Sequence, residues 1–320
     1  MKAWINDCQA MTAIQMTMNE PLLVVIAGPT AVGKTELGIK LARHLKTPII
    51  SADSRQFYRE MKIGTAAPTP EELKAVPHHF IHQLSVRDAF NVSRFETEVL
   101  LLLKELFKQH PVALMVGGSG LYIHAVCHGI DQLPDPDPEI RQRLKHMLET
   151  AGIIALQDEL RQVDPEYYGI VDLANPARLI RALEIYGATG VPYSALRTQT
   201  LKPRPFRILK IGIDLPREIL NERINKRVDE MIHAGLVEEA GQLFPLRHLN
   251  ALNTVGYKEL FDYMQGLTTL DFAIDKIKTN SRRYAKRQLT WFRKDQEFRW
   301  FRPDDLGSIL HLPELAPWVS

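Results

Sequence analysis

The sequence predicts an α/β fold: a parallel sheet core with an inserted all-helical domain and a helical C-terminal region. Three observations support this fold class. Short apolar runs alternate with segments of helical periodicity in the first 120 residues, and a glycine-rich loop joins the first run to the first such segment. A proline-rich run, Leu133–Pro138, marks a change to purely helical periodicity, and a strand-like segment returns at Arg207.

The first part of the predicted core alternates strands with helices. Leu22–Ala27 is a short apolar run, as expected of a strand buried in a parallel sheet. Lys34–Leu45 carries apolar residues at helical spacing. Further along the chain we expect a strand at Pro48–Ser51, a helix at Phe95–Phe107 and a strand at Val112–Val116.

The helical insertion is bounded by prolines. The Leu133–Pro138 run cannot be a helix interior or a central strand, so it is a linker. Glu139–Gly187 is expected to be helical throughout, apart from breaks at Gly152 and at Asp164-Pro165. The alternating segment Arg207–Leu215 then returns the chain to the sheet, and the remainder is mostly helical. We therefore expect a core of 21–132 and 203–320, an insertion of 133–202, and a loose leader at 1–20.

Composition places the chain in a reducing compartment. The only cysteines, Cys8 and Cys127, lie far apart and lack metal-ligand spacing, which argues against a disulfide framework or a cysteine zinc site. No run of 18 apolar residues occurs, so we expect neither a membrane span nor a membrane partner. The sequence thus predicts a cytoplasmic protein, which we expect to be a monomer.

Positive charge is concentrated near the C-terminus. Lys276–Lys294 holds eight basic residues and no acidic one, although the whole chain has a formal net charge of only +2. Like charges three or four residues apart on a helix repel each other, so a stripe of this kind is tolerated best beside a polyanion. The stripe predicts a polyanionic partner such as a nucleic acid.

The glycine-rich loop has the pattern of a phosphate-binding loop (P-loop). Its backbone N–H groups would surround phosphate oxygens, Lys34 would add a positive charge, and the Thr35 hydroxyl would hold Mg²⁺, the expected cofactor. A strand precedes the loop and a helix follows it, as the motif requires. The pattern predicts a diphosphate or triphosphate ligand without specifying a nucleotide. Its residues are Gly28, Pro29, Thr30, Ala31, Val32, Gly33, Lys34 and Thr35.

Two further segments follow strand ends and should face this loop. Asp53 comes just after the second predicted strand, where a carboxylate can act as a general base or hold magnesium through water. The alternative is a helix N-cap, with equal weight. The Val116–Tyr122 segment carries glycines that permit close backbone approach to a ligand, and Ser119 offers a hydroxyl; the alternative is an ordinary strand-to-helix turn.

Taken together, the motifs resemble those of the tRNA dimethylallyltransferases, also called tRNA isopentenyltransferases. The resemblance covers the chain from about Leu22 to Arg293. Its most specific part is Ala285–Phe292. The other matching stretches are Gly28–Thr35, Asp53–Tyr58, Ile63–Thr65, Pro77–His79, Gly117–Tyr122, Asn175–Glu184, Arg223–Gly235 and Gly256–Glu259.

The resemblance implies a reaction and a substrate. It implies that a dimethylallyl group moves from dimethylallyl diphosphate to N6 of the adenosine 3′-adjacent to the anticodon, in tRNAs reading codons that start with U. The insertion would bind the anticodon arm, and Asp53 would be the general base. Ser119 stands where the family usually has a catalytic threonine, and serine lacks the methyl group that restricts its rotamer. Val32 stands where the family more often has serine.

The resemblance also implies a set of binding residues. Arg223 and Arg227 would clamp the diphosphate, although surface salt bridging explains their spacing equally well. We expect Lys286 and Arg287 to meet RNA phosphates and Trp291 to act mainly in packing. The residues expected to contact tRNA are Asp53, Ser54, Arg55, Gln56, Ser119, Arg141, Ala177, Arg178, Leu179, Ile180, Arg181, Asn253, Thr254, Val255, Gly256, Tyr257, Lys258, Lys286, Arg287, Gln288, Leu289, Thr290, Trp291, Phe292 and Arg293.

Other interpretations of the sequence remain open. A small-molecule kinase shares the loop and the strand-end acid but needs no basic helical arm. A prenyltransferase for free adenine nucleotides would not need the insertion, and an RNA-binding protein without activity would not need Lys34 and Thr35 beside Asp53. His78 and His79 are adjacent, so in a strand they point to opposite sides, which favours a structural or substrate-shaping role over a metal pair.

Overall fold

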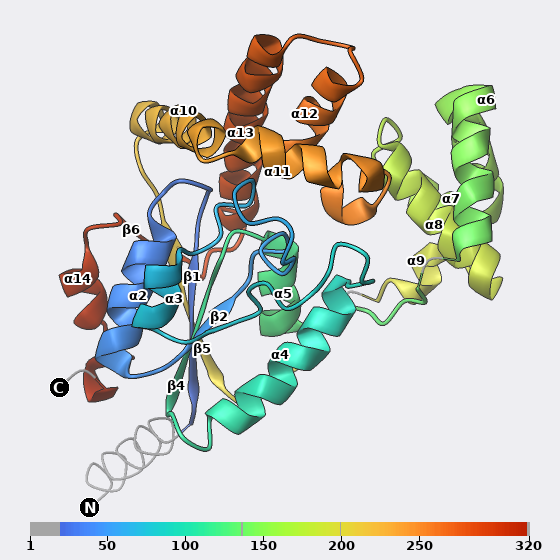
Figure 1. The fold of residues 1–320 in the computed structure, drawn as a ribbon. Coiled ribbons are helices and arrows are strands. Elements are labelled where there is room, and N and C mark those ends of the chain that lie inside the picture. The colour runs from blue at the N-terminus through green and yellow to red at the C-terminus, as the bar shows by residue number, and fades with distance from the viewer. Residues whose placement is uncertain (1–19, 136, 199, 319–320) are drawn as a thin grey trace, which may run out of the picture. The chain divides into compact units, whose positions relative to one another are not determined.

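A six-stranded parallel sheet forms the centre of the structure, a computed structural model that describes residues 20–135, 137–198 and 200–318. The strand order is β3-β2-β4-β1-β5-β6, so the first strand lies between two strands that come much later in the chain. The predicted α/β parallel sheet is confirmed (Figure 1). The strands are β1 (Leu22–Ala27), β2 (Ile49–Ser51), β3 (His78–His79), β4 (Val112–Gly117), β5 (Arg207–Ile213) and β6 (Arg299–Phe301).

The chain divides into two compact units. One, here called the sheet unit, consists of the residues up to Cys127 and from Arg204 onward; the other, the helical unit, is His128–Pro203. The insertion predicted from the sequence was 133–202. Apart from Glu20, the predicted leader lies outside the described residues.

Helices cover both faces of the sheet because alternate residues of its central strand point to opposite sides. Leu22, Val24 and Ile26 of β1 pack with α2 (Lys34–Leu45) and α14 (Leu306–Leu310). Leu23 and Val25 pack with α4 (Val92–Leu106) and α5 (Gly120–His128) on the other face. Figure 1 shows α2 and α14 on one side of the sheet and α4 on the other.

The C-terminal helices of the sheet unit have a hydrophobic core of their own. Val228, Leu236, Leu260 and Ile277 are among its buried members, and each comes from a different helix. These helices carry several residues that the resemblance assigned to substrate binding. They are α10 (Arg217–His233), α11 (Leu236–Leu243), α12 (Tyr257–Met264) and α13 (Leu270–Phe292); the remaining short elements are α3 (Pro70–Ala75), η1 (Phe244–Leu246), η2 (Asn250–Leu252) and η3 (Ala316–Trp318).

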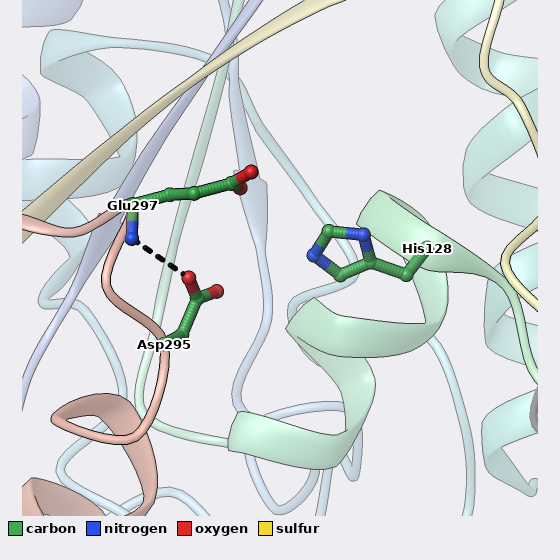
Figure 2. A group of neighbouring side chains, drawn as sticks. All are labelled: His128, Asp295 and Glu297. Carbon is green, nitrogen blue, oxygen red and sulfur yellow. Dashed lines mark hydrogen bonds between the residues drawn. The ribbon is translucent and has the colours of Figure 1, made fainter.

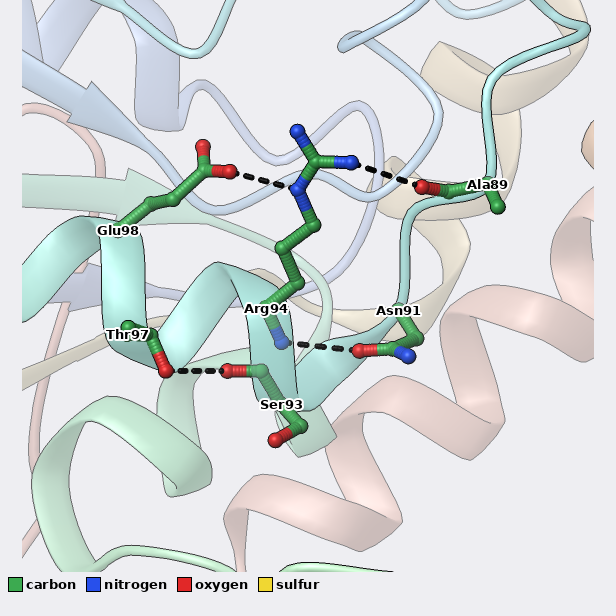
Figure 3. Close-up of polar contacts among 6 residues, drawn as sticks. All are labelled: Ala89, Asn91, Ser93, Arg94, Thr97 and Glu98. Carbon is green, nitrogen blue, oxygen red and sulfur yellow. Dashed lines mark hydrogen bonds and ion pairs between the residues drawn. The ribbon is translucent and has the colours of Figure 1, made fainter. Parts of the chain in front are cut away.

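Helix α4 begins one turn earlier than its apolar periodicity suggests. The Asn91 side chain accepts a hydrogen bond from the Arg94 N–H at 2.9 Å and so caps the helix (Figure 3). The Thr97 hydroxyl donates to the Ser93 carbonyl at 3.1 Å within the same turn, and Arg94 pairs with Glu98 at 2.7 Å. The polar first turn explains why the helix starts at Val92 rather than at the predicted Phe95.

Strand β5 keeps the predicted alternation, because Leu209, Ile211 and Ile213 share one hydrophobic cluster, but its other face is buried as well. Lys210 lies on that other face and is only 3% exposed, because β5 is covered on both faces. Its ammonium forms ion pairs with Asp295 and Glu297, both at 2.6 Å. These two carboxylates lie on one turn, where the Glu297 N–H donates to Asp295 (Figure 2). The same turn leads into β6, which the sequence analysis missed.

The helical unit consists of α6 (Pro138–Val163), α7 (Pro165–Tyr168), α8 (Pro176–Thr189) and α9 (Tyr193–Leu196). The predicted break at Gly152 is present, with φ 76°. The prediction of helix throughout was wrong for residues 169–175, which form turns. There Asn175 caps α8 by accepting from the Arg178 N–H, and a proline occupies the first helical position.

Within the described part of the chain, none of the helices combines the length and the apolar character that a bilayer crossing requires.

Candidate functional site

A cavity of about 700 Å³ lies in the sheet unit beyond the carboxyl ends of β1, β2 and β4. Ligands of parallel α/β sheets bind at this edge. The predicted loop, the predicted base and the basic helix therefore line one space. Its polar lining includes Thr30, Lys34, Thr35, Asp53, Gln56, Arg227, Tyr284, Arg287 and Gln288.

The phosphate-binding loop joins β1 to α2 through backbone that favours glycine. Gly33 has φ 105° and ends the loop at the N-terminus of α2. A side chain at Gly28 would bring its Cβ within 2.5 Å of the Ile213 carbonyl oxygen. The Lys34 ammonium reaches back over the loop and donates to the Pro29 carbonyl at 2.6 Å. Burial lowers the pKa of Lys34 to about 7, and a bound anion would favour the charged form of this lysine.

Arg223 and Arg227 on α10 both contact this loop. The Arg227 guanidinium donates to the Thr30 hydroxyl at 3.1 Å, and Arg223 donates to the Val32 carbonyl at 3.4 Å. Arg227 also lines the cavity. Both contacts are with the loop, and the clamp on a bound diphosphate stays a prediction.

Asp53 lies on a turn that follows β2 and faces the cavity. One of its carboxylate oxygens accepts from the Arg55 N–H at 3.1 Å, so the side chain organises a turn and does not cap a helix. Burial raises the pKa of Asp53, while the Arg55 N–H and the positive charges of Lys34 and Arg227 oppose that rise. A carboxylate with a raised pKa is a better proton acceptor than an ordinary surface aspartate.

Ser119 supports the turn that carries Asp53. Its hydroxyl oxygen accepts from the Ser54 N–H at 2.9 Å and lies 3.2 Å from the Ser54 hydroxyl. The side chain is buried. The observed contacts assign Ser119 a positioning role one residue away from Asp53, and its predicted catalytic role stays a prediction.

The glycines at the end of β4 and just after it allow other parts of the protein to pack closely. A Cβ at Gly117 would lie 2.2 Å from the Ala52 carbonyl oxygen. A Cβ at Gly118 would lie 2.3 Å from the Gln288 side-chain nitrogen, and one at Gly120 would lie 2.3 Å from the Trp291 ring. At their Cβ positions these glycines accommodate the Ala52 backbone and α13, while Gly117 also lines the cavity, so close approach of their backbone to a ligand stays a prediction.

Gln288 connects α13 to both of these loops. Its side-chain oxygen accepts from the Thr30 N–H, and its side-chain nitrogen donates to the Gly118 carbonyl, each at 2.9 Å. Only a tRNA contact was predicted for Gln288 from the sequence. Tyr284 was missed altogether, although it lies three and four residues before Arg287 and Gln288 on the same helix face. Burial, with the nearby Asp53 carboxylate, raises the pKa of Tyr284 to about 12.

Some residues predicted to contact tRNA in the sheet unit line the cavity, and others do not. Tyr257 and Phe292 are buried in hydrophobic clusters, so a contact of their side chains with tRNA is excluded in this arrangement. Trp291 is 45% exposed, more than expected of a packing anchor, although its ring packs against Gly120. The predicted contacts found in the lining are Asp53, Ser54, Arg55, Gln56, Asn253, Thr254, Val255, Gly256, Lys258, Arg287 and Gln288.

The rest of the α13 end is polar and accessible. Lys286 and Thr290 are exposed, Leu289 is partly buried, and Arg293 forms an ion pair with Asp214 at 2.5 Å. Arg287 lies over the Tyr284 ring at 5.8 Å. Lys286 can therefore contact a phosphate without first breaking an ion pair with another of the described residues.

In the helical unit the predicted tRNA contacts also divide into two groups. Leu179 and Ile180 are buried in the core of the unit, which corrects their assignment as contact side chains. Ala177 and Arg178 are exposed. Arg141 and Arg181 lie 3.4 and 3.7 Å from the carboxylate of Glu184, which is 1% exposed, so they neutralise a buried charge. A helix turns through 360° in 3.6 residues, so five consecutive positions cannot all face one ligand.

His78 lines the cavity from β3, and its ring nitrogen Nδ1 lies 2.8 Å from the Val76 carbonyl. Burial lowers the pKa of His78 and of His79. The lining does not include the side chain of His79. The structural or substrate-shaping role expected of these histidines stays a prediction.

Comparisons with known proteins give a consistent result. The family model described as IPP transferase matches residues 56–295. The chain is 54% identical over 293 residues to tRNA dimethylallyltransferase 1 of Bacteroides fragilis, covering 92% of this chain and 97% of the relative. It is 57% identical over 283 residues to the tRNA dimethylallyltransferase of Christiangramia forsetii, covering 88% and 94%.

Solved structures resemble the chain over most of its length. The full-length tRNA isopentenylpyrophosphate transferase from Bacillus halodurans matches with a TM-score of 0.68 and 38% identity, covering 93% of this chain and 98% of that one. A eukaryotic dimethylallyltransferase acting on tRNA matches with a TM-score of 0.72 and 26% identity, covering 93% and 77%.

Proposed function

Because the chain belongs to the IPP transferase family, we propose that it moves a dimethylallyl group from dimethylallyl diphosphate to N6 of the adenosine 3′-adjacent to the anticodon, in tRNAs reading codons that start with U. Relatives at 54% and 57% identity carry the name tRNA dimethylallyltransferase. The observation that carries the proposal is that the phosphate-binding loop and Asp53, a carboxylate suited to accept a proton, line the same cavity. Its place of action is proposed to be the cytoplasm.

The leaving-group side of the cavity is cationic. Breaking the allylic carbon–oxygen bond places negative charge on the departing diphosphate, and fixed donors aimed at that charge lower the barrier. Lys34 and Arg227 line the cavity beside the loop backbone. Both are held by neighbours, Pro29 and Thr30, so little reorganisation is needed when the charge develops.

Magnesium fits the same side. Thr35 and Asp53 both line the cavity and offer oxygen ligands, which Mg²⁺ prefers. We propose that Thr35 holds the ion, with Asp53 reaching it through water. When bound, Mg²⁺ would neutralise charge on the diphosphate.

The acceptor side would be organised by Asp53. An exocyclic amine is a weak nucleophile and must lose a proton as the new carbon–nitrogen bond forms. Asp53 is the carboxylate placed to accept that proton, and the raised pKa of its carboxyl suits the task. The adenine would have to leave its stack to enter the cavity, as other base-modifying enzymes require.

The polyanionic remainder of the substrate would meet basic surfaces on each unit. On the sheet unit the exposed cations of α13 include Lys286 and Arg287. On the helical unit Arg178 is exposed. We propose that the helical unit binds the anticodon arm.

The test is a prenyl-transfer assay with the purified protein, radiolabelled dimethylallyl diphosphate and an anticodon stem-loop. The expected product is a labelled N6-(dimethylallyl)adenosine, identified by mass analysis of the digested RNA. Free AMP serves as the acceptor control and should stay unlabelled. ATP consumption without prenyl transfer would support a small-molecule kinase instead, and labelled AMP would support a free-nucleotide prenyltransferase.

A further inference from the structure

The Glu239 side chain on α11 is bound by four hydrogen-bond donors of the sheet unit. One carboxylate oxygen accepts from the Lys62 and Ile63 N–H groups, each at 2.9 Å. The other accepts from the Gly64 N–H at 2.9 Å and from the Tyr257 hydroxyl at 2.6 Å. A single side chain therefore holds three successive backbone amides and the first residue of α12.

Gly64 and Tyr257 are fitted to this arrangement. A Cβ at Gly64 would lie 2.6 Å from the Tyr257 ring and hydroxyl, so only glycine allows its N–H to reach the carboxylate beside that ring. Tyr257 itself is 0% exposed. Burial and the neighbouring Glu239 carboxylate raise the pKa of Tyr257, so its hydroxyl remains a donor.

The segment that Glu239 holds is a wall of the cavity. Gly64, Thr65 and Ala66 are among the lining residues. The Thr65 and Ala66 carbonyls accept from the Gln56 side-chain nitrogen at 3.3 and 3.2 Å. Ala66 has φ 47°, so the turn is held in a left-handed conformation that needs outside support.

Gln56 in turn belongs to the segment that carries the proposed base. Its N–H donates to the Asp53 carbonyl at 3.1 Å, and its side-chain oxygen lies 3.3 Å from the Ser51 hydroxyl. A chain of direct contacts thus runs from Glu239 through the Lys62–Ala66 turn to Gln56 and the Asp53 loop. None of these contacts involves the phosphate-binding loop.

We propose that Glu239 is a positioning residue for the acceptor nucleotide: it fixes the Lys62–Ala66 turn so that Gln56 is oriented beside Asp53. The inference rests on the proposed function, because the acceptor it positions is the adenosine of tRNA. Glu239 acts on the acceptor half of the cavity through Gln56, and leaves the diphosphate half unaffected. A misplacement of about 1 Å at such a wall is enough to slow a reaction on the order of a hundredfold.

The test compares Glu239→Gln with Glu238→Gln, a neighbouring exposed glutamate on the same helix. The glutamine side chain has an NH₂ group in place of one carboxylate oxygen, so a donor would face backbone N–H donors. The substitution therefore removes hydrogen bonds without changing the size of the side chain. We expect kcat/KM for the anticodon stem-loop to fall roughly tenfold to a hundredfold. The KM for dimethylallyl diphosphate should stay within about twofold, and Glu238→Gln should leave both values unchanged.

A double-mutant cycle with Gln56→Ala separates positioning from a general loss of stability. Positioning predicts that Glu239→Gln causes little further loss once Gln56 is gone, whereas a purely structural role predicts that the two losses multiply. Multiplying losses, or an unchanged kcat/KM in Glu239→Gln, would overturn the inference. Tyr257→Phe removes one of the four hydrogen bonds and provides a milder variant with the same expected pattern if Glu239→Gln does not fold.

A second readout does not depend on prenyl transfer. Hydrogen exchange should show faster exchange of the Lys62, Ile63 and Gly64 amides in Glu239→Gln than in Glu238→Gln, and unchanged exchange would contradict the inference. A wild-type protein that fails to prenylate the stem-loop would contradict the proposed function, and the exchange result would then test only whether Glu239 fixes the Lys62–Ala66 turn.

Discussion

The Gln288 side-chain oxygen accepts a hydrogen bond from the Thr30 backbone N–H over 2.9 Å, although 258 residues separate the two in sequence. The basic helix α13 is therefore attached to the phosphate-binding loop at the first residue after Pro29. A ligand that moves α13 would therefore change the hydrogen bond to this N–H. A diphosphate that moves the loop would change the same hydrogen bond and so act on α13.

Replacement of Gln288 by Leu should weaken diphosphate binding by roughly tenfold, because it leaves the Thr30 N–H and the Gly118 carbonyl without their partner. Calorimetry with inorganic diphosphate measures the affinity. Thr290→Ala on the same helix is the control, since its hydroxyl donates only to the Lys286 carbonyl in the same helix. Equal affinities for the two variants would show that the loop keeps its conformation without Gln288.

Asp53→Asn should lower turnover by about a hundredfold or more while diphosphate binding is retained. The raised pKa of Asp53 gives this prediction a pH signature. Because the base must be unprotonated, kcat/KM of the wild type should fall as the pH drops through a pKa above the ordinary 3.8. The variant should lack this acidic limb. Near-normal single-turnover rates in Asp53→Asn would remove Asp53 from the role of base.

The affinity for diphosphate should fall as the pH rises above about 7, because the Lys34 ammonium deprotonates there. Below that pH the lysine is charged and binding is full; above it, affinity drops by up to about tenfold per pH unit. Dimethylallyl diphosphate is the ligand for this profile, because a phosphate ester of this kind has its last pKa at about 6 and stays ionised above pH 7, where the fall is expected. Lys34→Arg keeps its charge and should flatten the profile, whereas Lys34→Ala should bind weakly at every pH. A flat wild-type profile from pH 6.5 to 9 would refute the assignment.

Replacing both Lys286 and Arg287 by Ala should reduce the salt dependence of tRNA binding. Each lost phosphate contact removes about 0.7–0.9 from the slope of log affinity against log salt, so the slope should change by about 1.5. The affinity for diphosphate should be retained. A Lys40→Ala/Lys108→Ala pair is the control, because both lysines are exposed cations that pair with helix neighbours. An unchanged slope in the α13 variant would mean that the stripe binds something other than RNA.

Gly117→Ala should destabilise the fold by about 1–3 kcal/mol or more, because the new methyl group would clash with backbone of the Asp53 loop. Urea unfolding measures this change. Gly307→Ala in α14 is the matched control: no atom lies within 4 Å of its Cβ, and alanine should stabilise that helix by about 0.5–1 kcal/mol. If Gly117→Ala were as stable as the wild type, β2 and β4 could separate at this point without a loss of stability.

The sequence was sufficient for elements whose signal is local. Leu22–Ala27 and Lys34–Leu45 were predicted with the bounds that the structure has, because an apolar run and a helical period are properties of neighbouring residues. Strand β6 was missed because three residues beginning with Arg299 carry no such period. The burial of Lys210 was not predicted, because its partners, Asp295 and Glu297, follow 85 and 87 residues later.

The same limit applies to the candidate site. The loop motif gave the residues around Lys34 and Thr35, and the strand-end rule gave Asp53, since both depend on short segments. The role of Gln288 depends on a contact across the fold, and so do the glycines at 118 and 120 that accommodate α13. Leu179 and Ile180 were included because a continuous stretch was carried over from the resemblance, whereas the helix turns them into the core.

The strand order has a consequence for synthesis on the ribosome. Strand β1 pairs with β4 on one side and with β5 on the other, and β5 begins about 90 residues after β4 ends. At a synthesis rate of about 5–20 residues per second, roughly 5–18 seconds pass between the synthesis of β4 and that of β5, the second strand that pairs with β1. During that interval the apolar edge of β1 is open, while the helical unit, whose contacts are local, can already fold. The contact between Gln288 of α13 and the phosphate-binding loop can form only after α13 emerges, so the diphosphate site is completed 258 residues after Thr30 of its loop has been synthesised.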